Sequence, residues 1–148
     1  MNIIVERFNK IKSNINNNNN SNNIKIVAVS KTFPLEHIMP LIDHGHEHFG
    51  ENKVQEALEK WTIVKDDFNH IKLHMIGGLQ TNKVKYVIKL FDYIHSLDSL
   101  RLAEKISIEQ KKINKSLKIF IQVNIGEEDQ KLGIEIKNLE NFYEICVK

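Results

Sequence analysis

The residue with the clearest capacity for covalent chemistry is Lys31, which directly follows the apolar stretch Val27-Ala28-Val29-Ser30. If that stretch is a buried strand, the lysine amine lies at the carboxyl edge of a sheet, where α/β barrels build their sites. Apolar surroundings lower the pKa of a lysine, and the neutral amine attacks an aldehyde to form a Schiff base. A solvated lysine that blocks edge pairing explains the same position. Position alone leaves both interpretations open.

Small and polar residues also gather at the ends of the other predicted strands. Because the carboxyl ends of parallel strands share one edge of a sheet, these segments are candidates for the walls of a single site. The segments are Phe49-Gly50-Glu51-Asn52, His74-Met75-Ile76-Gly77, Leu79-Gln80-Thr81-Asn82-Lys83, His95-Ser96-Leu97-Asp98 and Gln122-Val123-Asn124-Ile125.

A metal site is the rival interpretation, because His44, His46 and His48 alternate along the chain. Alternate residues of one strand share a face, and histidines in that arrangement bind metal ions in metal-dependent barrel hydrolases. No second cluster of His with Asp or Glu follows at ligand-like spacing. Three partly exposed histidines around a turn are the simpler explanation.

The candidate residues are positioned by predicted strands and helices that alternate along the chain. Five βα units can be counted. An apolar, β-branched run predicts a strand at residues 24–30, and further strands are predicted at residues 46–50, 71–76, 91–95 and 117–125. Helical spacing of apolar residues predicts helices at residues 34–43, 53–65 and 82–90, one that begins with Asp98 as N-cap, and one at residues 134–147. Pro40 is expected to kink or shorten the first of these, because an interior proline removes a backbone donor.

The first 23 residues are predicted to form a helix and a loop. Apolar residues recur at helical spacing from Ile3 to Ile11, which predicts a short N-terminal helix. The Asn-rich tract at residues 14–23 has too few apolar side chains to offset the entropy of ordering, so a flexible loop is expected there. Residues 1–148 as a whole are predicted to be a single domain.

Strict alternation of strand and helix predicts an α/β fold with a parallel sheet, either doubly wound or a barrel. A dinucleotide-binding sheet requires a glycine-rich loop after its first strand. The segment Ser30-Lys31-Thr32-Phe33-Pro34 contains no glycine, which argues against that class.

Charge and composition argue against two kinds of partner. The chain has 21 Lys and Arg against 19 Asp and Glu, spread along its length, which does not resemble a nucleic-acid or anionic-membrane footprint. No apolar run approaches the roughly 20 residues of a membrane span, and residues 1–10 are too charged for the core of a signal peptide. Cys146 is the one cysteine, which fits a reducing compartment. We therefore expect a cytoplasmic protein without nucleic-acid or membrane partners.

From about residue 24 to residue 133, the sequence resembles the pyridoxal phosphate homeostasis protein family. The fold of this family is that of the N-terminal barrel domain of alanine racemase. The resemblance implies an incomplete (β/α) TIM-type barrel with about five of the eight βα units, preceded by the N-terminal helix. It rests on Ala28-Val29-Ser30-Lys31-Thr32, Phe49-Gly50-Glu51-Asn52 with Gln55-Glu56, residues 74–83, and Lys131-x-Gly133 after Val123-Asn124.

The resemblance implies that pyridoxal 5′-phosphate binds as a Schiff base on Lys31, with Asn52, His74 and Asn124 as wall residues of the pocket. Asn52 is explained as well by the N-cap of the helix that starts at Lys53, and His74 by a satisfied histidine inside the barrel. A non-catalytic role as an intracellular carrier in cofactor homeostasis is implied. In racemases of related fold, a separate domain supplies the second acid or base, and no such domain is present here.

The family continues well beyond the position of Lys148. That part carries the last strands, the Gly/Ser-rich loops for the cofactor phosphate and an arginine facing the pyridine nitrogen, none of which occurs in these 148 residues. We therefore expect a fragment, an interrupted gene product or half of a split protein. Open barrel edges favour self-association or a complementing chain. A truncated remnant without cofactor binding is the alternative.

Overall fold

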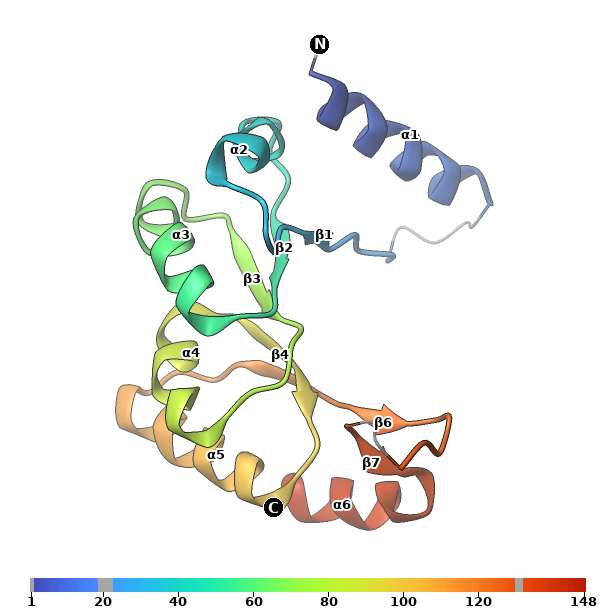
Figure 1. Ribbon diagram of the computed structural model, residues 1–148, viewed down its shortest axis with the longest axis vertical. Helices are drawn as coiled ribbons and strands as arrows, with labels where there is room; N and C mark the ends of the chain where they lie inside the picture. The colour runs from blue at the N-terminus through green and yellow to red at the C-terminus, as the bar shows by residue number, and fades with distance from the viewer. Residues whose placement is uncertain (1, 19–22, 130–131) are drawn as a thin grey trace.

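A five-stranded parallel sheet forms the centre of the computed structural model, which describes residues 2–18, 23–129 and 132–148. Its strands follow the order β1-β2-β3-β4-β5, so that each strand pairs with its neighbours in sequence (Figure 1). A two-stranded sheet, β6-β7, follows it. The bounds are β1 (Ala28–Val29), β2 (His48–Glu51), β3 (Lys72–Met75), β4 (Tyr93–Leu97), β5 (Lys118–Ile121), β6 (Val123–Asn124) and β7 (Ile134–Glu135).

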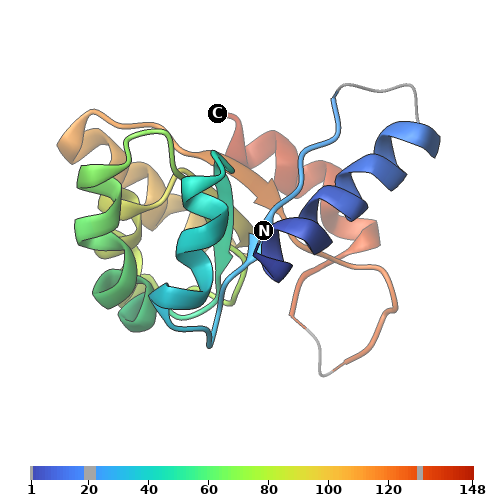
Figure 2. The same ribbon diagram turned by 90° about the horizontal axis from the view of Figure 1, so that it is seen from above.

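Four helices, α2 to α5, cover one face of the sheet (Figure 2). Helix α1 lies beside β1 and contacts α2, and α6 contacts α5 at the opposite end of the arc. Sequential parallel pairing with a helix between the strands is the arrangement of a (β/α) barrel, and the five strands make an open arc of it. The predicted fold class is confirmed. The helices are α1 (Ile3–Asn18), α2 (Leu35–Asp43), α3 (Val54–Asp67), α4 (Val84–Leu90), α5 (Leu100–Ile113) and α6 (Leu139–Cys146), with short 3₁₀ turns η1 (Thr81–Lys83) and η2 (Ile136–Asn138).

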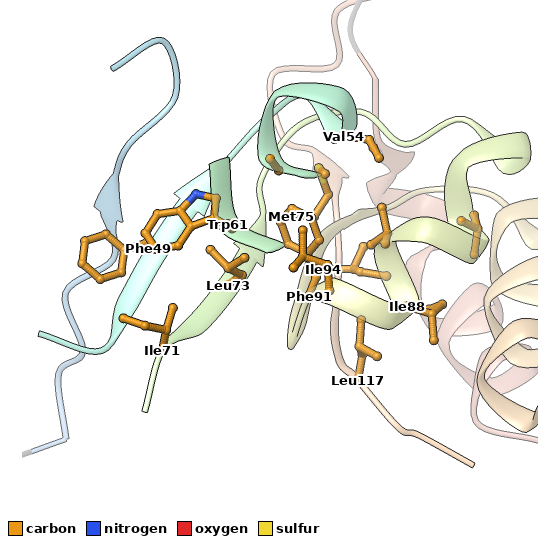
Figure 3. Packing of buried hydrophobic residues seen from close by; sticks show 14 of the residues in the cluster. Phe49, Val54, Trp61, Ile71, Leu73, Met75, Ile88, Phe91, Ile94 and Leu117 are labelled. Atoms are coloured by element: carbon orange, nitrogen blue, oxygen red, sulfur yellow. The ribbon is translucent and has the colours of Figure 1, made fainter. Parts of the chain in front are cut away.

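The hydrophobic core lies between the sheet and helices α2 to α5. Trp61 of α3 is fully buried, and its ring lies 5.0 Å from that of Phe49 on β2 (Figure 3). Leu73 and Met75 on β3 continue the same layer and are also fully buried. Successive side chains of a strand point to opposite faces, so burial of this set leaves the alternate set on the inner face of the arc.

The inner face is only partly covered. Val29 on β1 and Phe120 on β5 are each about half exposed, at 50% and 51%. Beside β1, a cavity of about 430 Å³ is lined by side chains from α1, β1 and α2, among them Phe8, Val27 and Leu41. Helix α1 thus packs near the free edge of β1, where Val5 is its buried residue.

The expected loop at residues 14–23 is wrong for its first half. Helix α1 continues to Asn18, so residues 14–18 are helical, while residues 19–22 lie outside the described part of the chain. Asparagine is a weak helix former, but each residue added to an existing helix gains a hydrogen bond without a new nucleation cost. Composition therefore underestimated the length of this helix.

The expected shortening of α2 at Pro40 does not occur, and the starts of two later helices differ from the predictions. Helix α2 runs through Pro40 to Asp43, because Leu41 and Ile42 are buried against the sheet and hold the last turn in place. The N-cap of α5 is Ser99 instead of Asp98, and its side chain accepts a hydrogen bond of 3.1 Å from the backbone N–H of Leu102.

The last predicted helix starts later than expected. Ile134 and Glu135 form strand β7, which pairs in parallel with β6, and α6 begins only at Leu139. Gly133 precedes this strand with φ of 118°, and a Cβ there would lie 2.8 Å from the backbone nitrogen of Asn124. The close approach of two backbones therefore fixes β7. Within the described residues, no helix is long and apolar enough to cross a membrane.

Leu73→Ala tests the buried layer between sheet and helices. Removal of a fully buried leucine side chain is expected to lower the free energy of unfolding by about 2–5 kcal/mol, measured by urea denaturation. Ile63→Ala is the matched control, because Ile63 on α3 is 73% exposed and its truncation should change the free energy by less than about 0.5 kcal/mol. Equal losses in the two variants would contradict this location of the core.

Candidate functional site

The end of β1 is fixed to β2 and α3 by a buried carboxylate. The side chain of Glu51 is fully buried, and its Oε1 accepts hydrogen bonds from the Ser30 hydroxyl at 3.0 Å and the Trp61 indole N–H at 2.8 Å. The ammonium group of Lys60 lies 2.7 Å from the same oxygen. Ser30 also donates its backbone N–H to Gly50, which extends the pairing of β1 with β2. The residue before Lys31 is therefore held on its helix-facing side.

Lys31 is exposed in the turn that follows β1. We expected apolar walls around its amine, and the described residues do not enclose it. The register that pairs Val29 with Gly50 puts Lys31 and Asn52 just beyond the ends of neighbouring strands. The structure thus brings these two predicted site residues to the same part of the sheet edge.

Asn52 is not a helix N-cap. Helix α3 begins at Val54, its N-cap residue is Lys53, and no side chain caps it. Within the described residues, Oδ1 of Asn52 is buried and has no hydrogen-bond partner. Buried polar atoms nearly always have a partner, so this amide is available to a bound molecule.

Position 77 must be a glycine because Asn52 lies directly against it. A Cβ at Gly77 would lie 2.8 Å from the Cβ of Asn52 and 2.9 Å from its Cα, which no real side chain tolerates. The loop after β3 therefore approaches the end of β2 so closely that only glycine fits at this position. Gly78 has more room, since its nearest neighbour would be a methyl carbon of Leu132 at 3.4 Å.

His74 is the middle member of a chain of three hydrogen-bonded histidines across the inner face. Its Nε2 lies 2.9 Å from Nδ1 of His48 on β2, and its Nδ1 lies 2.8 Å from Nε2 of His95 on β4. A neutral imidazole donates through one nitrogen and accepts through the other, so a neutral chain satisfies both bonds. His74 is only 4% exposed. The interpretation as a satisfied histidine inside the barrel accounts for its contacts.

Aromatic packing and burial keep this chain neutral. The ring of His74 stacks on Tyr93 at 4.0 Å and 7°, and His95 lies 4.6 Å from the ring of Phe120. Desolvation, together with the neighbouring His95 and His48, lowers the pKa of His74 to about 4. Desolvation also lowers the pKa of His48 and that of His95.

Asn124 lies apart from this group, on β6. Its amide Nδ2 donates to the backbone carbonyl of Glu128 at 2.8 Å, which closes the turn after the strand. The adjoining cavity of about 420 Å³ is lined by four carboxylates, Glu127, Glu128, Asp129 and Glu135, and by Lys137, which pairs with Glu135 at 3.1 Å, so its lining is mainly acidic and disfavours a phosphate. Lys131, part of the same predicted motif, lies outside the described residues.

His44, His46 and His48 do not converge. His44 follows α2 and bonds Asn9 at 3.1 Å, whereas His46 contacts the backbone carbonyl of His48 at 2.8 Å. His48 is engaged with His74. The described residues contain no group of three or more His, Cys, Asp or Glu side chains able to hold a metal ion, so the hydrolase alternative has no geometric support.

Sequence reasoning missed the roles of Lys60 and of the histidine chain. Lys60 reaches the strand ends from the second turn of α3, and nothing in its local sequence marks it. A signal for the histidines was present, because His48, His74 and His95 occur in three consecutive predicted strands. We named only His74 as a wall residue of the pocket and considered His48 only as a metal ligand.

A match with a family model identifies the class of protein. The model of the alanine racemase N-terminal domain matches residues 7–148, and the chain belongs to this family. An alanine racemase of Clostridium difficile 630 shares the fold with a TM-score of 0.67 at 17% identity, over 90% of this chain and 35% of the racemase.

Within this family, the more similar relatives are pyridoxal phosphate homeostasis proteins, which confirms the resemblance. The protein of Pasteurella multocida (strain Pm70) is 36% identical over 132 residues, which are 84% of this chain and 57% of the relative. That of Aquifex aeolicus (strain VF5) is 40% identical over 124 residues, 84% of this chain and 54% of the relative. The chain spans about half the length of these relatives.

Solved structures of PipY from Synechococcus elongatus PCC7942 have the same fold. The structure with PLP bound has a TM-score of 0.86 at 30% identity, and the match covers 98% of this chain and 64% of PipY. The structure without PLP has a TM-score of 0.85 at 31% identity, over 95% of this chain and 63% of PipY.

The lowered pKa of His74 predicts a pH-dependent stability. Between pH 6.5 and about 4, the unfolded histidine binds a proton that the folded one does not, so acidification through this range removes up to roughly 3 kcal/mol of stability. Stability from this group is complete above pH 6.5. His74→Phe, which keeps a ring for Tyr93, should show a smaller loss. Urea denaturation at the two ends of the range measures both proteins, and an identical loss in the variant would contradict the assignment.

Proposed function

We propose that this chain binds pyridoxal 5′-phosphate covalently through Lys31 and takes part in intracellular homeostasis of that cofactor. The observation that carries the proposal is an exposed lysine just beyond the end of β1, beside the buried amide oxygen of Asn52, which follows β2 and has no hydrogen-bond partner among the described residues. The fold around this pair is that of PipY, which has been solved with PLP bound. Named homeostasis proteins among the relatives support the biological role.

The residues of this chain fit a covalent role for Lys31. When bound, the cofactor supplies an aldehyde carbon and an electron-withdrawing pyridine ring. Lys31 would hold the cofactor through its side-chain nitrogen, by condensation with the aldehyde carbon that the cofactor would supply and loss of water. The turn after β1 leaves the lysine accessible, and Ser30 beneath it is fixed by Glu51.

The other predicted wall residues have different parts in the proposal. Asn52 offers its unpartnered amide to the cofactor. His74, both of whose nitrogens are occupied, would contribute its ring to the inner face of the pocket wall. For Asn124, contact with the cofactor stays a prediction, since its amide closes a turn.

We propose a carrier without turnover. Catalysis of racemisation or transamination needs an acid or base placed against the bound substrate in addition to the lysine. Of the titratable groups around the strand ends, Glu51 and Glu56 are paired with Lys60, and the members of the histidine chain bond one another. The single cysteine supports a reducing, cytoplasmic location.

Treatment with pyridoxal 5′-phosphate followed by borohydride tests the covalent role. Borohydride adds hydride to the C=N bond and leaves a stable secondary amine, and peptide mass mapping then locates it. We expect labelling of Lys31 to exceed that of other exposed lysines such as Lys53 and Lys111. Lys31→Arg is the control, since it keeps the charge and should abolish the enrichment.

Uniform labelling of all exposed lysines would contradict the proposal. It would favour the alternative of a remnant without specific cofactor binding. A racemase or transaminase assay on the same preparation tests the carrier role, because measurable turnover dependent on Lys31 would replace it with an enzymatic one.

We further propose that the partly covered inner face binds protein, either a second copy or a complementing chain. Val29 lies on β1, the free edge of the sheet, and is 50% exposed. Exposed edge strands promote pairing between chains, and a lysine on such a strand opposes it.

Val29→Lys is therefore expected to lower the average molar mass measured by sedimentation at high protein concentration. Ile63→Lys is the matched control, because Ile63 on α3 is 73% exposed but lies on a helix outside the sheet. A chain that stays monomeric at all concentrations, or an equal effect of both substitutions, would contradict association through this edge.

A further inference from the structure

Side chains from α3 hold both peptide bonds of Lys31. On its N-terminal side, the ammonium group of Lys60 donates a 2.8 Å hydrogen bond to the backbone carbonyl of Ser30. On its C-terminal side, the backbone N–H of Thr32 donates a 2.6 Å hydrogen bond to Oε1 of Glu56. Lys60 and Glu56 also bond each other at 3.2 Å, one helical turn apart. The backbone on either side of Lys31 is thus bound to a single ion pair.

The ion pair between Lys60 and Glu56 is held in place by a second carboxylate, that of Glu51. Lys60 is 8% exposed and lies 2.7 Å from Oε1 of the fully buried Glu51. A lysine between two carboxylates keeps its charge compensated at a buried position, and its stem packs against the helix. Glu51 and Glu56 therefore fix Lys60 from opposite ends, which in turn fixes the Ser30 carbonyl.

The backbone held in this way is strained. Thr32 has φ of 66°, in the left-handed region that β-branched residues avoid. Strained backbone persists only when its surroundings determine it, and such residues cluster at functional sites. The hydrogen bond from Thr32 also lowers the pKa of Glu56, so the acceptor is the charged carboxylate. A charge-assisted bond of this kind is stronger than a neutral one.

We propose that Glu56 and Lys60 are positioning residues for Lys31, which preorganise its backbone so that its amine is presented to the aldehyde of pyridoxal 5′-phosphate. This role rests on the proposed function of Lys31. Neither residue touches the cofactor in this proposal. Their effect is to restrict the position of the Lys31 backbone, from which its side chain extends. Restriction of a reactive group to a productive geometry increases its rate of reaction.

The test compares labelling of Lys31 in Glu56→Ala and Glu56→Gln. Each protein is treated with pyridoxal 5′-phosphate and borohydride, and the rate at Lys31 is divided by the rate at Lys111 on α5. Glu56→Ala is expected to lower this ratio about tenfold, the size of the effect when one hydrogen bond to a charged group is lost. Glu56→Gln keeps an oxygen acceptor for Thr32 and should restore most of the ratio.

Glu109→Ala is the matched control for general destabilisation. Glu109 on α5 accepts hydrogen bonds from Lys105 at 3.0 Å and Lys112 at 2.9 Å, so it also serves two donors, but far along the chain from Lys31. Its loss should leave the labelling ratio unchanged. Circular dichroism checks folding, and if Glu56→Ala is unfolded, Glu56→Asp takes its place, because it keeps the charge while withdrawing the carboxylate by one methylene.

A second measurement needs no cofactor. Hydrogen exchange of the Thr32 amide, followed by mass spectrometry, should be faster in Glu56→Ala than in the unmodified chain and in Glu109→Ala. An unchanged exchange rate would show that the hydrogen bond does not hold this turn, and would overturn the proposal.

Different results contradict the positioning role of Glu56 and the covalent role of Lys31. Lys31 labelled equally in the unmodified chain and in Glu56→Ala would overturn the positioning role and leave the proposed function intact. No enrichment at Lys31 in the unmodified chain would contradict the proposed function, and the positioning role would fall with it.

Discussion

The arrangement of residues at the carboxyl ends of the first strands depends on the buried carboxylate of Glu51. One oxygen of this fully buried group accepts from Ser30 on the first strand and from Trp61 on α3, and it pairs with Lys60. A buried charge without its partner costs about 3–5 kcal/mol, so strand and helix must meet in this one arrangement. The turn that carries Lys31 follows directly from it. The packing of β1 against α3 and the position of Lys31 therefore both depend on the buried carboxylate of Glu51.

The two faces of the sheet differ in the side chains that they bury. The face toward α2 to α5 is an apolar layer built around Phe49, Trp61 and Leu73, which supplies most of the burial (Figure 3). The inner face instead carries the neutral chain of His48, His74 and His95, where each ring satisfies the next. Hydrogen bonding between neutral rings lets polar groups be buried without a charge, which keeps that face rigid beneath the strand ends.

Much of the fold followed from periodicity, because each strand and helix buries its own apolar pattern. The five main strands were expected near their observed positions, and the order of elements was correct. Errors arose where tertiary contacts or nucleation outweighed composition: α1 extends into the Asn-rich tract, and Ile134 is a strand residue because Gly133 brings two backbones together. Asn52 was weighed as an N-cap, which the structure excludes by starting α3 at Val54.

The sequence by itself determined the α/β class, the position of Lys31 at a strand end and the family resemblance, since these depend on local pattern and ordered motifs. Only the tertiary structure decided which side chains meet across strands. Lys60 and Glu56 are one helical turn apart in sequence, yet their bonds to Ser30 and Thr32 require the first two turns of α3 to lie beside the turn that follows β1. Hydrogen bonds between residues distant in sequence depend on packing, which no local pattern encodes.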